Sequence, residues 1–317
     1  MSYLAEARAR ELRLDPRRVL PGCRSILVLA VRYASPGRDG ASPGMDGASP
    51  ADPGASGDDP RGRVAAYAWG TDYHRVLPER MKALVAFIEE RAGHPVASRG
   101  YTDTGPVLER DLAQRAGLGW IGRNTCLINP RLGSYLFLAE LFLDLELEPD
   151  APFAADRCGS CRRCIEACPT QCILPDRTLD ARACLSYLTI ELKGPIPEEL
   201  RPALGDHLFG CDICQQVCPW NRFADGPVDP AFRARLGVPA PALVAELELT
   251  PEAFNRKFKD SPVQRARRRG YRRNAAVALG NAGEGSAAAA LERAADDPDP
   301  GVRECAAWAL KKVRSGE

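Results

Sequence analysis

A run of closely spaced cysteines constrains this chain more than any other feature. Cys158, Cys161 and Cys164 follow one another at intervals of three residues, and Cys168 follows four residues later, directly before Pro169. This spacing is typical of thiolate ligands to 4Fe–4S clusters, in which three cysteines hold one cluster and the fourth reaches a second cluster. The chain must therefore supply further ligands elsewhere.

The remaining ligands are available downstream. Cys211, Cys214 and Cys218 repeat the end of the motif, again with a proline after the last cysteine, and Cys184 lies between the two runs. Eight cysteines then divide into two sets of four by the crossed pattern. The first set is Cys158, Cys161, Cys164 and Cys218, and the second set is Cys168, Cys184, Cys211 and Cys214.

Zinc ligation and disulfide formation are two other uses of closely spaced cysteines. Zinc sites also use CxxC pairs, but they usually take four ligands as two separated pairs, whereas three cysteines here lie within seven residues. Disulfides need an oxidising compartment, and residues 1–10 contain no apolar segment of a secretory signal. We therefore expect a cytoplasmic protein. The other cysteines are expected to be small core residues: Cys23, Cys126, Cys172 and Cys305.

The length of 317 residues suits two or three domains, each with its own core. The longest apolar runs, residues 25–31 and 135–145, are too short or too interrupted by charge to span a bilayer. The formal net charge of +1 does not by itself indicate a nucleic-acid partner. We expect no contact with a membrane.

Residues 1–150 alternate strand and helix patterns, which predicts an α/β domain. Residues 35–62 interrupt it with a glycine- and proline-rich segment, which we interpret as a flexible surface insertion. The expected elements are a strand at 25–31, a helix at 78–91, a helix at 107–116 and strands at 120–129 and 133–145.

Two further domains are predicted after residue 150. Residues 151–225 form a ferredoxin-like module for two 4Fe–4S clusters, in which metal ligation replaces much of the apolar core. Residues 226–317 are helical and alanine-rich, and residues 272–279 align with residues 303–310 at a period of 31 residues. That period suggests a short HEAT-like repeat.

A basic stretch lies within the third domain. Residues 256–273 contain nine Lys or Arg residues and one acid, Asp260. Such a run is either a solvated helical face or a binding site for a polyanion.

The chain resembles the epoxyqueuosine reductase family, whose members are cobalamin-dependent iron–sulfur enzymes of tRNA modification. The resemblance extends over nearly the whole chain and depends on motifs that are specific in combination. These motifs are residues 67–74 (YAWGTDYH), 103–110 (DTGPVLER), 109–124, 133–135, 158–161, 184–186 and 187–194.

The resemblance implies a two-electron reduction that removes the epoxide oxygen of epoxyqueuosine, at the tRNA wobble position, as water. It implies an N-terminal cobalamin-binding domain of α/β or α+β class, with cobalamin cycling between cob(II)alamin and cob(I)alamin. The two clusters would pass electrons singly from an external one-electron reductant. A monomer is expected, and tRNA carrying epoxyqueuosine is the expected partner.

The resemblance also implies site residues. Asp103 matches the aspartate that protonates the departing oxygen, although Asp-Thr-Gly-Pro before a helix is also a common capping sequence. Basic residues at Lys193, Arg267, Arg268 and Arg269 would bind tRNA. The corrin would be lined by Arg13, Ala65, Asp103, Asn124, Leu127, Leu138, Ser186, Cys211 and Asp212.

His74 is one of three histidines, and we interpret it as structural because family members bind cobalamin without a protein histidine on cobalt. The chain differs from its relatives in three respects. The strand and helix that precede Arg13 in relatives are expected to be missing, Ala65 replaces a cysteine found in some relatives, and residues 36–60 are an insertion.

Two alternative functions remain open on the sequence. An electron-transfer ferredoxin with added domains would contain the clusters without a corrinoid. A reductive dehalogenase would share the cofactors, but the basic stretch, the HEAT-like region and the absence of an export signal disfavour it.

Overall fold

The computed structural model describes residues 6–33, 59–224 and 227–315. Their contacts divide the chain into two compact units, each assembled from separated segments. The first unit comprises Met1–Tyr33, Asp72–Cys161 and Cys218–Ala231, and the second comprises Ala34–Thr71, Arg162–Val217 and Phe232–Glu317. The predicted domain boundaries at residues 150 and 225 remain predictions.

Most of the predicted insertion at residues 35–62 lies outside the described residues. Residues 60–62, at its end, are hydrogen-bonded to a distant part of the chain. The Gly62 N–H donates to the Pro241 carbonyl at 2.9 Å, and the Leu243 N–H donates to the Pro60 carbonyl at 2.8 Å. Backbone pairing with residues far along the chain therefore makes this end part of the second unit.

The first unit is built on a three-stranded sheet in the order β1-β6-β3. The strands are Ser25–Arg32, Leu136–Leu143 and Ser98–Tyr101, and both pairings are antiparallel. The expected class was α/β or α+β, and the antiparallel pairing makes this unit α+β. Alternation of helices and strands in sequence does not determine strand direction, because the segments between β3 and β6 return the chain antiparallel instead of crossing over.

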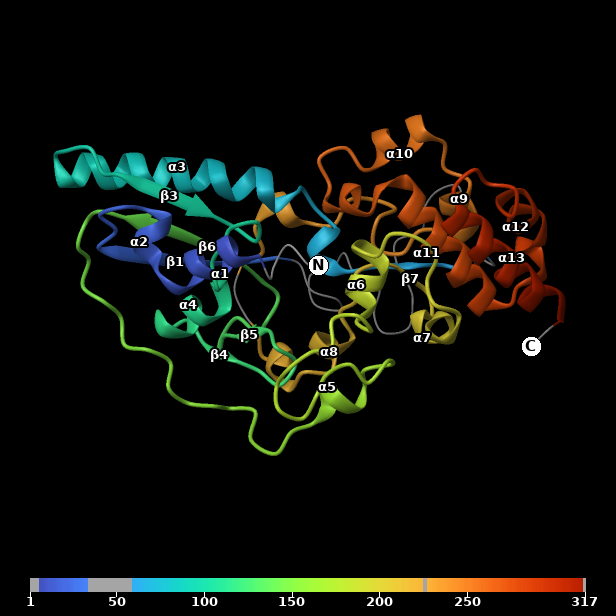
Figure 1. Cartoon of the computed structure of the whole chain (residues 1–317), viewed down its shortest axis with the longest axis horizontal. Coiled ribbons are helices and arrows are strands. Elements are labelled where there is room, and N and C mark those ends of the chain that lie inside the picture. Colours follow the sequence, from blue (N-terminus) through green and yellow to red (C-terminus); the bar gives the residue numbers. More distant parts are fainter. Residues whose placement is uncertain (1–5, 34–58, 225–226, 316–317) are drawn as a thin grey trace. The chain divides into compact units, whose positions relative to one another are not determined.

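Helices α3 (Tyr73–Ala92) and α4 (Glu109–Arg115) pack on the sheet, and Figure 1 shows them on opposite faces. Leu27 and Leu141 belong to the apolar cluster under α3, whereas Val28 and Leu138 belong to the cluster under α4. Successive strand residues point to opposite faces. Two covered faces therefore explain why residues 25–31 form an unbroken apolar run, and the predicted strand is confirmed.

Two predicted elements of the first unit were wrong in extent. Helix α3 begins at Tyr73 instead of residue 78, because the Asp72 side chain caps it by accepting the His74 N–H at 3.0 Å. Residues 120–129 form a hairpin of β4 (Trp120–Ile121) and β5 (Leu127–Ile128), not one strand. A turn separates the two, with Thr125 at φ 63°.

The remaining described elements of the first unit are short. They are α1 (Ala7–Leu14), α2 (Pro16–Val19), η4 (Pro219–Arg222) and the start of η5 (Pro230–Phe232).

The second unit contains a parallel pair of short strands, β2 (Arg63–Val64) and β7 (His207–Phe209). Short helices accompany the cysteines: α5 (Arg163–Glu166), α6 (Leu185–Ile190) and α8 (Ile213–Gln216). The other elements are η2 (Ala66–Ala68), η3 (Glu198–Leu200), α7 (Arg201–Leu204), α9 (Leu243–Leu247), α10 (Pro251–Lys257), η6 (Pro262–Ala266) and η7 (Gly285–Ala287).

The C-terminal part of the second unit is helical, as predicted. It consists of α11 (Arg267–Ala282), α12 (Ala288–Ala294) and α13 (Pro300–Ser315). The two aligned segments of the predicted repeat lie within α11 and α13, and these two helices pack on each other. Within the described part of the chain, no helix has the length and apolar character needed to cross a bilayer.

Candidate active site

Asp103 lies between β3 and α4, in a backbone conformation with φ 59° that only glycine adopts without cost. The capping interpretation of this residue does not hold, because α4 begins at Glu109 with Leu108 as its N-cap. The Asp103 side chain is 61% exposed. Asp103 therefore combines a strained backbone with an exposed side chain, a combination that is often found at functional sites.

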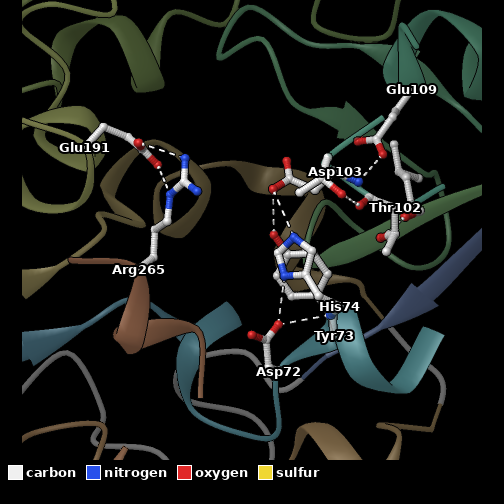
Figure 2. A network of polar contacts seen from close by, with 10 residues as sticks. Asp72, Tyr73, His74, Thr102, Asp103, Glu109, Glu191 and Arg265 are labelled. Carbon is white, nitrogen blue, oxygen red and sulfur yellow. Dashed lines mark hydrogen bonds and ion pairs between the residues drawn. The ribbon is translucent and has the colours of Figure 1, made fainter. Parts of the chain in front are cut away.

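Two side chains from the start of α3 contact the Asp103 carboxyl, as Figure 2 shows. The Tyr73 hydroxyl donates to Asp103 Oδ2 at 2.9 Å, and His74 Nε2 lies 3.5 Å from the same oxygen. The other ring nitrogen of His74, Nδ1, lies 2.8 Å from Asp72 Oδ1. Because Asp72 also caps α3, the helix start fixes the position of the imidazole.

The electrostatics of this group favour a charged imidazole. Burial lowers the pKa of His74, but hydrogen bonding to Asp103 and Asp72 and the charges of these carboxylates outweigh it and raise the pKa to about 9. For Asp72, burial works against the charged form, yet His74 holds the pKa of the carboxyl below its usual range. At neutral pH an imidazolium therefore lies between two carboxylates, and it carries a proton next to Asp103.

Five of the predicted corrin-lining residues lie in the first unit. Leu127 and Leu138 belong to one apolar cluster, and Asn124 is buried in the hairpin turn beside it. Thr102 donates to the Leu138 carbonyl at 2.8 Å, which ties the Asp103 segment to β6. Asp103 and Arg13, on α1, complete the five.

The other four predicted lining residues lie in the second unit. The pairing of β2 with β7 brings Ala65 to Cys211 and Asp212: the Ala66 N–H donates to Asp212 Oδ2 at 2.6 Å. Burial raises the pKa of Asp212 to about 6. Gly210 has φ +69°, and a Cβ there would lie 2.5 Å from the Ala65 Cβ. This close approach leaves no room for a side chain. Ser186 lies on α6.

The thiols of the predicted second cluster converge in the second unit. Cys168 is part of a small apolar cluster against which Cys184 and Cys214 pack, and Cys211 is close enough to influence both Cys168 and Cys184 electrostatically. In the described residues no three such side chains approach one another closely enough for a single metal ion.

The predicted first cluster has ligands in both units, so its set remains a prediction. Within the first unit, Cys158 and Cys218 pack in one apolar cluster around Trp120, although 60 residues separate them. Trp120 Nε1 donates to Cys158 Sγ at 3.4 Å. Such N–H···S bonds are one means by which a protein tunes a cluster's reduction potential. Cys164 lies in the second unit, where it packs against the apolar side-chain cluster that contains Cys168.

The basic stretch is not a uniform charged face. Arg273 is 2% exposed and donates to the carbonyls of Leu188, in the last turn of α6, and of Leu192 and Gly194, which follow the helix. Buried Arg272 forms an ion pair with Asp297.

The remaining charges of the stretch also differ in exposure. Arg265 is paired with Glu191 at 2.8 Å (Figure 2). Arg268 is half-buried, with Nε donating to the Leu249 carbonyl. Arg267 and Arg269 are exposed, as is Lys193.

Sequence reasoning missed several residues of this site. Tyr73 and His74 belong to a motif quoted above, but their contact with Asp103 could not be foreseen from a separation of about 30 residues. Glu109 lies in the same motif as Asp103 and accepts the Asp103 N–H. An Asp-x-x-x-x-x-Glu spacing across a turn was the one signal available for that pair.

Comparison with known families supports the class of protein that these features define. Residues 157–221 match the family described as "4Fe-4S double cluster binding domain", and residues 263–317 match HEAT repeats. The chain is thus a two-cluster iron–sulfur protein with a helical repeat. Residues 13–104 match the family described as "Epoxyqueuosine reductase QueG, DUF1730".

Similar proteins identify the family. The epoxyqueuosine reductase of Xanthomonas campestris is 46% identical over 251 residues, which is 79% of this chain and 70% of that protein. The epoxyqueuosine reductase of Escherichia coli is 38% identical over 278 residues, 87% of this chain and 69% of that protein. The chain belongs to the epoxyqueuosine reductase family.

Solved structures agree. A crystal structure of epoxyqueuosine reductase with a tRNA-Tyr epoxyqueuosine-modified stem loop gives a TM-score of 0.86 at 34% identity, covering 96% of this chain and 77% of that one. The structure of epoxyqueuosine reductase from Streptococcus thermophilus gives 0.84 with the same coverage. This membership disfavours the ferredoxin and dehalogenase alternatives.

Proposed function

We propose that this chain reduces epoxyqueuosine to queuosine in tRNA. The observation that carries the proposal is the Asp103 carboxyl, held beside two proton-bearing side chains, Tyr73 and His74, in a chain of this family. Removal of an epoxide oxygen as water, leaving an alkene, consumes two electrons and two protons. The protein must therefore deliver both the electrons and the protons to the epoxide.

Electrons would come from an external one-electron reductant through the two 4Fe–4S clusters. Bound cobalamin would supply, in its reduced Co(I) form, a nucleophile strong enough to open the epoxide. The family resemblance assigns Leu127, Leu138 and Asn124, which lie together in the first unit, to corrin binding. Glycine at position 210 allows the backbone there to pack directly against Ala65.

Asp103 would donate a proton to the departing oxygen. A carboxylate can donate only after it has gained a proton, and His74, an imidazolium at neutral pH, is placed to supply one across 3.5 Å. Tyr73 orients the accepting oxygen by its hydrogen bond. General acid catalysis by a positioned group of this kind typically contributes about 10² to 10⁴ in rate.

Substrate turnover tests the function directly. Protein reconstituted with iron, sulfide and cobalamin is expected to bind roughly eight irons and to show a cob(II)alamin signal in its EPR spectrum. With a strong reductant it should convert tRNA carrying epoxyqueuosine to tRNA carrying queuosine, detected by mass spectrometry of the nucleosides. Fully loaded protein that leaves epoxyqueuosine unchanged would contradict the proposal.

The exposed part of the basic stretch is expected to bind tRNA phosphates. Changing both Arg267 and Arg269 to alanine should weaken tRNA binding and reduce its salt dependence by roughly one unit of slope per lost contact. Fluorescence anisotropy across a salt titration measures both quantities. Removal of two exposed charges from α3, Lys82→Ala with Arg91→Ala, is the matched control. Equal weakening in the two variants would assign the effect to net charge alone.

A further inference from the structure

A fully buried carboxylic acid lies beneath the Asp103 segment. Glu140 occupies the central strand β6, is 0% exposed, and lies opposite Val28 of β1 and Tyr101 of β3. It shares the α4 side of the sheet with Leu138, two residues earlier. Within the described part of the chain, neither of its carboxyl oxygens makes a hydrogen bond of ordinary geometry. An isolated charge in such a place would cost several kcal/mol.

The charged neighbour of Glu140 is Glu109, the first residue of α4. Burial, followed by the charge of Glu109, raises the pKa of Glu140 to about 9. Burial raises the pKa of Glu109 to about 7, against the opposing effect of its hydrogen bond from the Asp103 backbone. Two adjacent carboxyls, one fully buried and the other half-buried, disfavour ionisation of both at neutral pH, and the fully buried one, Glu140, keeps its proton.

Glu109 is also the partner of the Asp103 backbone. Its Oε1 accepts the Asp103 N–H, and Asp103 itself is in the left-handed region at φ 59°. Strained residues persist only where surrounding groups hold them. Thr102 supplies one such tie through its bond to the Leu138 carbonyl, and Glu109 supplies the other.

We propose that Glu140 and Glu109 share a single proton and act as positioning residues for Asp103. Protonated Glu140 stabilises Glu109 as an anion without a second charge in the sheet, and anionic Glu109 then holds the Asp103 amide. Loss of the Glu140 proton places two negative charges side by side in an apolar interior, which pushes Glu109 off the Asp103 segment. The catalytic consequence rests on the function proposed above, whereas the shared proton does not.

Among the described residues, few other titratable or charged groups face this pair. Asp103 and Arg110 act on Glu109, the first raising and the second lowering its pKa. Across β6, the groups opposite Glu140 are the Val28 side chain and the Tyr101 phenol. His74 acts on the pair only through Asp103.

Infrared spectroscopy of the intact, reconstituted protein tests the shared proton without any turnover. At pH 7.5 the wild type should show the C=O stretch of a buried protonated carboxyl, and the band should titrate away with a midpoint near pH 9. Glu140→Gln, which keeps the size and an N–H donor toward Glu109, should remove that band. Asp103→Asn controls for a proton on Asp103 and should retain the band. No band at pH 7.5, or a band unchanged in Glu140→Gln, would overturn the proposal.

The positioning role is tested by single-turnover rates with pre-reduced enzyme. In the wild type, the rate should fall at alkaline pH as Glu140 loses its proton. Glu140→Gln should keep a near-normal rate at pH 7.5 and should lack this part of the alkaline fall. Glu109→Gln, a weaker acceptor for the Asp103 amide, should lower the rate about 10-fold at every pH, with tRNA affinity within about twofold of wild type. If the fall in rate at alkaline pH is unchanged in Glu140→Gln, that fall belongs to another group, such as His74, and the positioning role is refuted.

Discussion

Asp103→Asn is expected to lower the single-turnover rate of the pre-reduced enzyme by about 10² or more. The substitution preserves size and polarity, and the amide oxygen can still accept the Tyr73 hydrogen bond, but an amide cannot donate an acidic proton to the departing oxygen. Iron content, cobalamin binding and tRNA affinity should stay as in the wild type, because asparagine has nearly the same shape as aspartate and can keep the hydrogen bond from Tyr73.

His74→Gln provides the companion measurement for Asp103. Glutamine can still donate a hydrogen bond toward Asp103, but it cannot carry a titrating proton. The wild-type rate is expected to hold below the His74 pKa of about 9 and to fall above it, as the imidazolium loses its proton. His74→Gln should lose the His74 contribution to this fall and keep the contribution of Glu140. A near-normal rate in Asp103→Asn would refute the donor assignment whatever the histidine variant does.

Cys214→Ala is expected to remove the second cluster and with it multiple turnover. The bound iron should fall from about eight atoms to about four, because a 4Fe–4S cluster that loses one of four thiolates is rarely retained. Iron analysis and EPR spectroscopy of the reduced protein measure the loss directly, and steady-state conversion of epoxyqueuosine should fall to background. Single turnover by protein reduced chemically beforehand should survive better than steady-state turnover.

Cys172→Ala is the matched control for this prediction. Cys172 is buried in the same apolar cluster, and its sulfur lies 3.4 Å from Cys168 Sγ, yet it is outside the predicted ligand set. The variant should therefore keep about eight irons. If Cys172→Ala loses iron and Cys214→Ala does not, the ligand set of the second cluster must be reassigned.

Local sequence patterns predicted the local structure well. The apolar run at residues 25–31 forms β1, the segment before Gly117 forms α4, and the repeat at a period of 31 residues forms α11 and α13. In each case the signal is a periodicity or a turn residue within a few positions. The extents were wrong where a capping side chain, as at Asp72, or a turn in the backbone, as at Thr125, decided them.

The basic stretch shows why charge patterns are less informative. Arg267, Arg272 and Arg273 look equivalent in sequence, but Arg267 is exposed and Arg273 is buried against carbonyls about 80 residues earlier in the chain. Whether an arginine is solvated or structural depends on what packs over it. That packing comes from α6 and α9, which the local sequence of α11 does not specify.

The sequence by itself determined the iron–sulfur chemistry, because seven of the eight predicted ligands lie in two short runs whose spacing restricts the chemistry that they can perform. Only the tertiary structure decided how Asp103 can work as an acid. Its partners Tyr73 and His74 come from the start of α3, and the Glu109–Glu140 pair beneath it joins α4 to β6. The physical reason is that a proton's position depends on burial and on charges a few ångströms away. Those neighbours are brought together by folding of the sheet, across sequence separations that no local pattern spans.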